Sequence, residues 1–430
     1  MKKILKLALV FGFALFSAMN FIACGSNTQE GKSNAKDSIA ASDKKMSNSN
    51  SSPSDNFRDF VYKEINDGNE YEISASPLFI MKLVNSDISK DVVIPSTYNG
   101  KPVTAIGANA FENLYMITKI TIPDSVTVIE KSAFSGCFGI NRVILGNATT
   151  KIGDEAFYDC KSLNSINIPE TLTYLGDYTF RGCSNLQSTI IIPDAVTNSL
   201  KGTFSRCSKL TSVTIGMGIS KIGYAAFYKT GLTSIIIPSN IKSIEDEAFR
   251  ECDELISVTI EDDGVTHIEG GNISGAFRDC SKLKTIIFGN KLEYIGKNAF
   301  QNCSSLESLT FPASLITINE NAFRECKDLV NINFENCAAS IGVWAFERCS
   351  KLKNIDFGDS LVRISAWAFN DCANITEITL PASLEYLGGP SMPPFYGCNQ
   401  PIIKVKKLLS PPSGWAIRWD TDCGEIYWGQ

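Results

Sequence analysis

Cysteine is the residue type with the greatest chemical potential here, because the chain has 14 cysteines in 430 residues. Eleven of them stand three residues after a phenylalanine: Cys137, Cys160, Cys183, Cys207, Cys252, Cys280, Cys303, Cys326, Cys349, Cys372 and Cys398. Disulfides need pairs, whereas this set is odd in number and evenly spaced. A free cysteine behaves as a small buried hydrophobe, so the pattern predicts buried thiols. Disulfides between neighbouring repeats, or between Cys398 and Cys423, remain alternatives.

The only histidine is the second candidate for chemistry. His267 lies in the segment from Glu261 to Glu269, beside Asp262 and Asp263. Strand alternation points His267 outward, and no nucleophile is spaced to use it as a base. The acidic residues could suit calcium, but their spacing is not specific for it. The sequence therefore predicts no catalytic residue, no metal ligand and no cofactor, and we expect a protein that is not an enzyme.

The cysteines follow a phenylalanine that returns about every 23 residues. The repeat comprises Phe111, Phe134, Phe157, Phe180, Phe204, Phe227, Phe249, Phe277, Phe300, Phe323, Phe346, Phe369 and Phe395. A fixed period of this length is typical of a solenoid, in which each short unit buries its apolar side chains only against its neighbours. A solenoid offers a long surface for binding rather than a deep pocket.

One repeat shows how such a unit is expected to fold. Ile166 and Ile168 alternate with polar residues, as in a short strand with one buried face, and Pro169 ends that strand. Leu172 and Leu175 then point inward from a second extended piece. Phe180 and Cys183 are three residues apart, which fits one helical turn.

This pattern resembles the BspA-like leucine-rich repeats, a class of bacterial cell-surface proteins with 23-residue units. The resemblance covers residues 92–400, about 13 units, and residues 57–107 are similar to the entry unit of that family. It implies a β-rich, right-handed solenoid with a parallel sheet on the inner side and short strands and helical turns on the other. We expect caps at residues 57–91 and 401–430, because the end of a solenoid exposes core.

The N-terminus has the features of an export signal. Lys2 and Lys3 precede an apolar run from Leu7 to Ala18, which suits a signal peptide over residues 1–23. The sequence Phe21-Ile-Ala-Cys24-Gly resembles the bacterial lipoprotein processing site, and the resemblance implies that Cys24 is the lipid attachment residue. Residues 24–56 are rich in serine and asparagine and form a predicted flexible tether. We therefore expect an exported protein that is lipid-anchored to the bacterial envelope, at the outer membrane or cell surface.

The net charge of the chain limits the classes of partner that it is expected to bind. The whole chain carries −6, while residues 1–56 hold seven lysines and four acidic residues, so the rest carries −9. Nucleic acids and anionic lipids need a basic face, so we expect no nucleic-acid partner and membrane contact through the lipid anchor only.

The outward positions of the first strand of each unit form the predicted ligand-binding face. Its candidate residues are Arg142, Ser165, Asn167, Ser212, Thr214, Ser257, Thr259, Ser308, Thr310, Asn331, Asn333, Asn354, Asp356 and Glu377. Most are small hydroxyl or amide residues, and the face begins basic and ends acidic. They either bind an extended partner through many weak contacts, or are simply the residues that suit any exposed strand.

Trp344 and Trp367 form a second candidate site. They occupy the same position, two residues before the repeat phenylalanine, in adjacent units. The pair is either a binding hot spot, where tryptophan is enriched, or a cover over a thinly packed flank. The irregular unit from Glu261 to Phe277 has five extra residues, which form either a binding loop or a loop without consequence.

The resemblance implies adhesion, so the sequence predicts a non-catalytic surface protein that recognises an extracellular or surface protein or glycan ligand. The alternative is a structural surface spacer or envelope-assembly scaffold that binds a partner from the same cell. The sequence leaves the ligand and the oligomeric state open.

Overall fold

The computed structural model describes residues 58–85, 90–334, 337–389, 392–416, 420 and 423–430. The expected signal peptide, Cys24 and the expected tether lie outside the described residues, as does Trp419. The division of the chain into five segments, residues 1–23, 24–56, 57–91, 92–400 and 401–430, stays a prediction.

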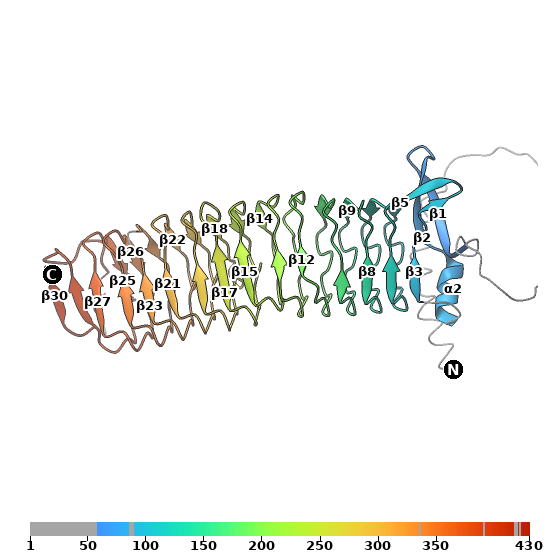
Figure 1. Ribbon diagram of the computed structural model, residues 1–430. Coiled ribbons are helices and arrows are strands. Elements are labelled where there is room, and N and C mark those ends of the chain that lie inside the picture. The colour runs from blue at the N-terminus through green and yellow to red at the C-terminus, as the bar shows by residue number, and fades with distance from the viewer. Residues whose placement is uncertain (1–57, 86–89, 335–336, 390–391, 417–419, 421–422) are drawn as a thin grey trace, which may run out of the picture. The chain divides into compact units, whose positions relative to one another are not determined.

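The first strands of most units pair in parallel with the equivalent strand of the next, as Ile-x-Ile alternation requires, and their ladder is divided into five successive sheets. Figure 1 shows these strands side by side from β3 to β30. They are β3 (Asp91–Val93), β6 (Lys119–Thr121), β8 (Arg142–Ile144), β10 (Ser165–Ile166), β12 (Ile190–Ile191), β13 (Val213–Thr214), β15 (Ser234–Ile237), β17 (Ser257–Ile260), β19 (Thr285–Ile287), β21 (Ser308–Thr310), β23 (Asn331–Asn333), β25 (Asn354–Asp356), β27 (Glu377–Leu380), β29 (Ile402–Val405) and β30 (Ile426–Trp428).

A second set of shorter strands runs along another side of each coil and also pairs in parallel. In this set a polar residue faces out and an aliphatic residue faces in, so Ile129, Ile152 and Leu175 are fully buried. The strands are β5 (Lys101–Ile106), β7 (Val128–Ile129), β9 (Lys151–Ile152), β11 (Tyr174–Leu175), β14 (Lys221–Ile222), β16 (Ser243–Ile244), β18 (His267–Ile268), β20 (Tyr294–Ile295), β22 (Thr317–Ile318), β24 (Ser340–Ile341), β26 (Arg363–Ser365) and β28 (Tyr386–Gly388). The structure is thus a parallel-strand β-solenoid of about 14 turns with little helix.

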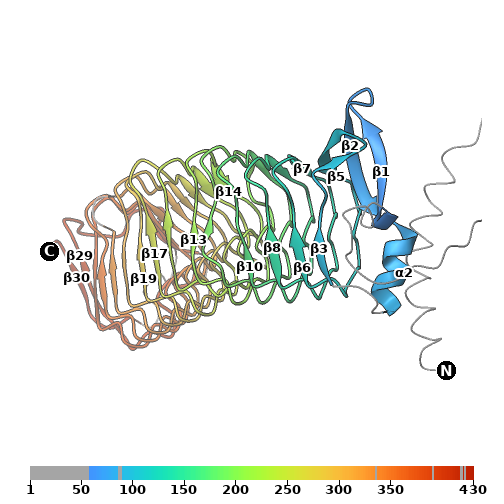
Figure 2. The ribbon, with the colours of Figure 1, turned by 45° about the vertical axis from the view of Figure 1, so that its right-hand side comes forward.

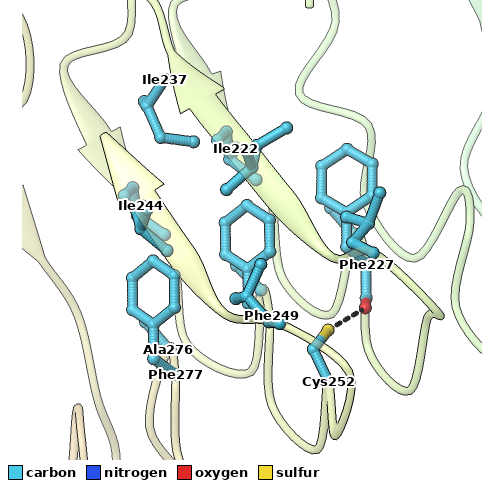
Figure 3. Close-up of a cluster of buried hydrophobic side chains, with 14 of the residues drawn as sticks. Ile222, Phe227, Ile237, Ile244, Phe249, Cys252, Ala276 and Phe277 are labelled. Atoms are coloured by element: carbon cyan, nitrogen blue, oxygen red, sulfur yellow. Dashed lines mark hydrogen bonds between the residues drawn. The ribbon is translucent and has the colours of Figure 1, made fainter. Parts of the chain in front are cut away.

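The repeat phenylalanines form one continuous stack inside the solenoid. All thirteen are fully buried, and successive rings lie 4.9–5.7 Å apart between centroids. Figure 3 shows Phe227, Phe249 and Phe277 in this stack. The shared interior of successive repeats, on which the prediction of a solenoid depended, is confirmed.

The cysteine after each repeat phenylalanine lies buried beside that stack. Its thiol donates a hydrogen bond to the backbone carbonyl of the phenylalanine one unit earlier, as Cys252 does to Phe227 (Figure 3). All eleven thiols of this set make the equivalent bond, at 3.0–3.4 Å. All eleven cysteines of this set are free thiols. The cysteine therefore gives a buried carbonyl a partner while filling a small apolar slot.

The segment around each repeat phenylalanine, from two residues before it to two after, is not the expected helical turn. We call this strip the turn wall. Glu155 and Asp159, on either side of Phe157, both have positive φ, at 56° and 54°. Left-handed residues cannot continue a right-handed helix, so consecutive β-turns form instead, with Ala156 N–H bonded to Gly153 O.

The turn wall is held by hydrogen bonds to the next unit. Phe157 N–H donates to Thr179 O, and Asp159 N–H donates to Arg181 O. The left-handed residue two before the phenylalanine recurs at Asn109, Ser132, Glu155, Tyr178, Gly202, Ala225, Glu247, Asn298, Asn321, Trp344 and Trp367. The second recurs two after it at Asn113, Gly136, Asp159, Gly182, Arg206, Lys229, Glu251, Asp279, Asn302, Glu325, Arg348, Asp371 and Gly397.

The N-terminal end of the solenoid is covered by an antiparallel hairpin and the only helix among the described residues (Figure 2). The elements are β1 (Phe60–Ile65), β2 (Glu70–Ala75), α2 (Pro77–Asn85) and the short β4 (Thr97–Tyr98). Ser76 caps α2, because its Oγ accepts the Phe79 N–H at 3.1 Å. The Phe79 ring packs 6.5 Å from Phe111, the first ring of the stack.

At the other end, Trp415 is buried and lies against Trp428, with ring centroids 5.9 Å apart. Its Nε1 donates to Leu384 O at 3.0 Å. Aromatic side chains therefore pack near both ends of the solenoid.

Candidate functional site

The outward side of the first-strand sheet brings the predicted binding residues into two straight columns. We call these columns the ladder face. Arg142 pairs with Ser165, and Ser308, Asn331 and Asn354 follow one another in register. The second column is equally regular, through Thr310, Asn333 and Asp356. None of the fourteen candidates is buried. The sequence therefore placed them on one exposed face correctly, while their role in binding stays a prediction.

Three of the candidates, Asn167, Asn331 and Asn354, also make contacts that hold the sheet together. Asn167 follows the end of β10, and its side-chain amide bonds the Leu145 N–H at 2.8 Å and the Leu145 O at 2.9 Å. Asn167 thus substitutes for a missing pair of strand hydrogen bonds. Asn354 Nδ2 donates to Asn331 Oδ1 at 2.7 Å, which links neighbouring strands through their side chains.

Charge is confined to the two ends of the ladder face. Lys119 and Arg142 lie at its start, and Asp356 and Glu377 at its end. Glu377 is already paired, because Lys404 Nζ lies 2.6 Å from its Oε1. Between Ser165 and Asn354 the two columns contain only hydroxyl, amide and aliphatic side chains. Such a face suits an uncharged ligand, since a charged one would lose its water without gaining a partner.

The ladder face also carries aliphatic residues that the candidate set omitted. Val93, Ile191, Ile236 and Ile287 are each 60–62% exposed. The sequence did show Ile144, Ile236 and Ile287 as outward positions. Ile191 was harder to place, because its unit contains one extra residue before the strand. The signal that could have found this set is its regular alternation with polar residues along the second column.

The two tryptophans stack on each other, as their equivalent positions suggested. The Trp344 and Trp367 rings are 5.5 Å apart between centroids and 12° from parallel, and both side chains are half-buried. Both residues have left-handed backbone conformations, with φ of 54° and 53°. A bulky residue is costly there, whereas other units place asparagine at the same position, at Asn298 and Asn321.

The rest of the turn wall in this half of the molecule neutralises its own charges. Arg324 Nε lies 2.8 Å from Glu347 Oε2, and Arg348 Nε lies 3.6 Å from Asp371 Oδ2. Within a single unit, Arg250 contacts Glu247 at 2.9 Å. Because these charges satisfy one another on the turn wall, we attribute a structural role to them rather than a binding one.

His267 is placed as the sequence indicated, outward on β18 and half-buried. Its ring lies 5.5 Å from the Tyr294 ring, and its Nδ1 lies 2.9 Å from Thr266 Oγ1. Nearby, Asp262 accepts the Asn290 N–H at 3.0 Å. Within the described residues no group of three or more His, Cys, Asp or Glu could hold a metal ion.

The irregular unit forms a small projecting loop. Gly270 and Gly275 make an antiparallel bridge, and Asn298 Nδ2 donates to Gly271 O at 2.6 Å. Ile273 at its tip is 80% exposed. Gly270 must be glycine, because a Cβ there would lie 1.9 Å from Lys297 O.

Comparison with known proteins gives one family. Residues 104–200, 187–275 and 273–401 match the model described as the BspA type leucine rich repeat region, with six copies. A leucine-rich cell surface protein from Faecalibacterium prausnitzii A2-165 is 25% identical, with a TM-score of 0.50 over 86% of this chain and 93% of that protein. A leucine-rich repeat protein from Bacteroides ovatus is 24% identical, with a TM-score of 0.43 over 76% of this chain and 94% of that one. No curated protein matches this chain.

Proposed function

Since the chain belongs to the BspA-type leucine-rich repeat proteins, we propose that it is a non-catalytic cell-surface binding protein that recognises a protein or glycan ligand. Adhesion to a host surface or a neighbouring cell is the role that this proposal favours. The observation that carries it is the ladder face, a long and exposed array of mostly small polar side chains that stand in register within each sheet.

The physical support is that the interior, the turn wall and the ladder face of the solenoid differ in how their side chains are paired. The interior is closed by the phenylalanine stack, and the turn wall pairs its charges with one another. The ladder face has few such pairs, so most of its hydroxyl and amide groups point to solvent. Many weak polar contacts along a rigid scaffold can hold an extended partner without loop ordering, which reduces the entropic cost of binding.

The proposal is tested by exposing the purified full-length protein to labelled host cells, to extracellular matrix proteins and to envelope proteins of its own cell. Adhesion requires saturable binding to the cells or the matrix proteins. If only envelope proteins of the producing cell bind, adhesion is rejected, and the protein is an envelope scaffold. A ladder-face variant with Asn331→Ala and Asn333→Ala should reduce the binding, and a turn-wall variant with Asn302→Ala serves as the control.

We further propose that Cys24 carries a lipid that anchors the protein to the bacterial envelope. Among the described residues no helix is long and apolar enough to cross a membrane. Several acyl chains would give firm attachment, whereas a single chain binds membranes only marginally. Mass spectrometry of the mature N-terminus should find acylated Cys24 as the first residue. An unmodified cysteine, or a chain that starts elsewhere, would reject the anchor.

The tryptophan pair gives a prediction that separates binding from folding. We expect Trp344→Asn with Trp367→Asn to weaken ligand binding about tenfold, since stacked tryptophans are typical hot spots. The melting temperature should stay the same or rise, because asparagine adopts the left-handed conformation at lower cost. Binding isotherms and thermal melts of the same samples measure both effects.

The matched control for the pair is Glu155→Asn, which introduces the same residue at the same left-handed position of another unit. It should leave binding unchanged, and its melting temperature should likewise stay the same or rise. If the double tryptophan variant binds as well as the native protein, the pair is a cover over the flank and not a binding site.

A further inference from the structure

The second column of the ladder face alternates between aliphatic and polar residues. Reading along the stack, the residues are Val93, Thr121, Ile144, Asn167, Ile191, Thr214, Ile236, Thr259, Ile287 and Thr310. Pairings fix the register from Val93 through Thr121 to Ile144, at Ile191 beside Thr214, and from Ile236 through Thr259 to Ile287, and the succession of units sets the order of these three groups. We call the five aliphatic residues of this series the aliphatic stripe. It places one solvent-facing aliphatic side chain on every second strand.

The aliphatic stripe has no structural explanation in the packing. Four of its members are about 60% exposed, whereas the interior residues beside them, such as Ile190 and Ile235, are buried. Threonine or serine would serve equally well at an exposed strand position, as neighbouring units show. Aliphatic groups repeated along one solvent-facing side form a surface that a ligand with a matching repeat would contact at every turn.

The spacing between successive residues of the aliphatic stripe distinguishes the common backbone conformations of a polypeptide ligand. Two strand spacings amount to about 9.5 Å. A polyproline II helix repeats every three residues, at about 9.3 Å. An extended strand presents the same side about every 6.7 Å. Two turns of an α-helix take about 10.8 Å, so a helix would drift by more than 1 Å at each step. Only the polyproline II repeat stays aligned over the length of the stripe.

The residues between the aliphatic positions fit the same ligand. A polyproline II chain makes no internal hydrogen bonds, and proline has no N–H, so such a chain exposes carbonyl oxygens that accept hydrogen bonds. The alternating positions offer hydroxyl donors at Thr214, Thr259 and Thr310. The ladder face is also without charge from Ser165 to Asn354, which complements an uncharged chain.

We infer that the aliphatic stripe binds an uncharged, proline-rich segment in the polyproline II conformation. The segment lies across the strands, with one turn of the ligand for every two units of the solenoid. This inference deepens the proposed function, on which it rests, by naming the class of ligand. A ligand already fixed in this conformation loses little entropy on binding, which suits a surface of individually weak contacts.

The test uses the purified full-length protein and a labelled, blocked twelve-residue peptide, (Leu-Pro-Pro)4, which has one leucine per turn. A peptide of the same composition with irregularly spaced leucines tests the interval. The flexible peptide (Leu-Gly-Ser)4 tests the conformation. Fluorescence anisotropy should show binding of the first peptide, and at least about fivefold weaker binding of each of the others.

Substitutions in the aliphatic stripe form the second part of this test. Ile191→Ser and Ile236→Ser should each weaken binding of (Leu-Pro-Pro)4 about fivefold, and the double variant about twentyfold, because each removes one exposed contact. Ile316→Ser is the matched control, since Ile316 is 58% exposed but lies beside the second set of strands. It should leave the affinity unchanged, and all variants should keep the native melting temperature.

The inference is overturned if the first peptide does not bind, or if it binds equally well to the stripe variants. It is also overturned if the variants change only self-association in sedimentation experiments, or only the binding of an uncharged glycan. Each of these failures leaves the proposed function standing, provided that the protein still binds cells or matrix proteins. Loss of all surface binding in that separate assay would reject the proposed function instead.

Discussion

Raising the pH from 8 to about 10.5 should unfold this solenoid, while most mesophilic domains of comparable packing would lose only part of their stability. The reason is the set of buried thiols. Burial raises the pKa of ten thiols in the set of eleven: Cys137, Cys160, Cys183, Cys207, Cys280, Cys303, Cys326, Cys349, Cys372 and Cys398. Each of these thiols also donates its proton to a backbone carbonyl.

The direction of the effect follows from proton binding. In the unfolded chain a cysteine has a pKa of about 8.5. Above that pH the unfolded state loses thiol protons while the folded state keeps them, so the free energy of unfolding falls as pH rises. Each protected thiol contributes about 1.4 kcal/mol per pH unit to the fall. The stabilisation is complete below pH 8.5 and is lost progressively above it, towards the raised pKa of the folded protein.

Circular dichroism during a pH titration measures the transition, and alkylation with iodoacetamide reports the thiols directly. At pH 8 we expect the buried thiols to resist alkylation, whereas they should react once the protein unfolds at about pH 10.5. The control is a variant with Cys303→Ala and Cys326→Ala, which removes two ionisable groups from the middle of the set. The pH at which half of this variant is unfolded should be higher than its stability at pH 7 alone would predict. A native protein that stays folded at pH 11 would contradict this account of the thiols.

The thiols and the phenylalanine stack were predictable from the sequence because the repeat length is nearly constant. A constant length forces equivalent residues of successive units into register, so one period defines every column at once. The exposed positions of Ser308, Asn331 and Asn354 followed from the same argument. Ile191 shows the limit of this argument, because a single extra residue in its unit shifts it out of the regular spacing.

The turn wall could not be predicted, for a physical reason. The three-residue spacing of Phe180 and Cys183 fits a helical turn as well as it fits consecutive β-turns. A left-handed backbone position is usually indicated by glycine in the sequence, whereas here residues such as Glu155, Arg206 and Trp344 adopt this conformation. Their strain is offset by backbone hydrogen bonds to the next unit, and those bonds exist only in the assembled stack. These hydrogen bonds therefore cannot be inferred from the local sequence.

Phe300→Ala should destabilise the protein by about 4 kcal/mol, the range found when a large aromatic residue is removed from a tight core. The Phe300 ring is fully buried, with the rings of Phe277 and Phe323 each 5.0 Å away on its two faces. Phe288 approaches its edge at 6.0 Å. The substitution therefore removes three ring contacts and leaves a cavity that two rigid neighbouring units cannot close. Urea denaturation measures the loss.

The matched control is Phe138→Ala, the same change at a ring that is 44% exposed and contacts Lys161 at 5.0 Å. It should cost less than about 1 kcal/mol, since little apolar surface is lost and an exposed cation–π contact is weak. The difference between the two variants isolates the contribution of the stack. Because each unit contacts only its neighbours, hydrogen exchange in Phe300→Ala should accelerate most in the units that hold Phe277, Phe300 and Phe323. Equal losses in the two variants, or exchange that accelerates evenly along the chain, would show that the phenylalanines do not act as one continuous interior.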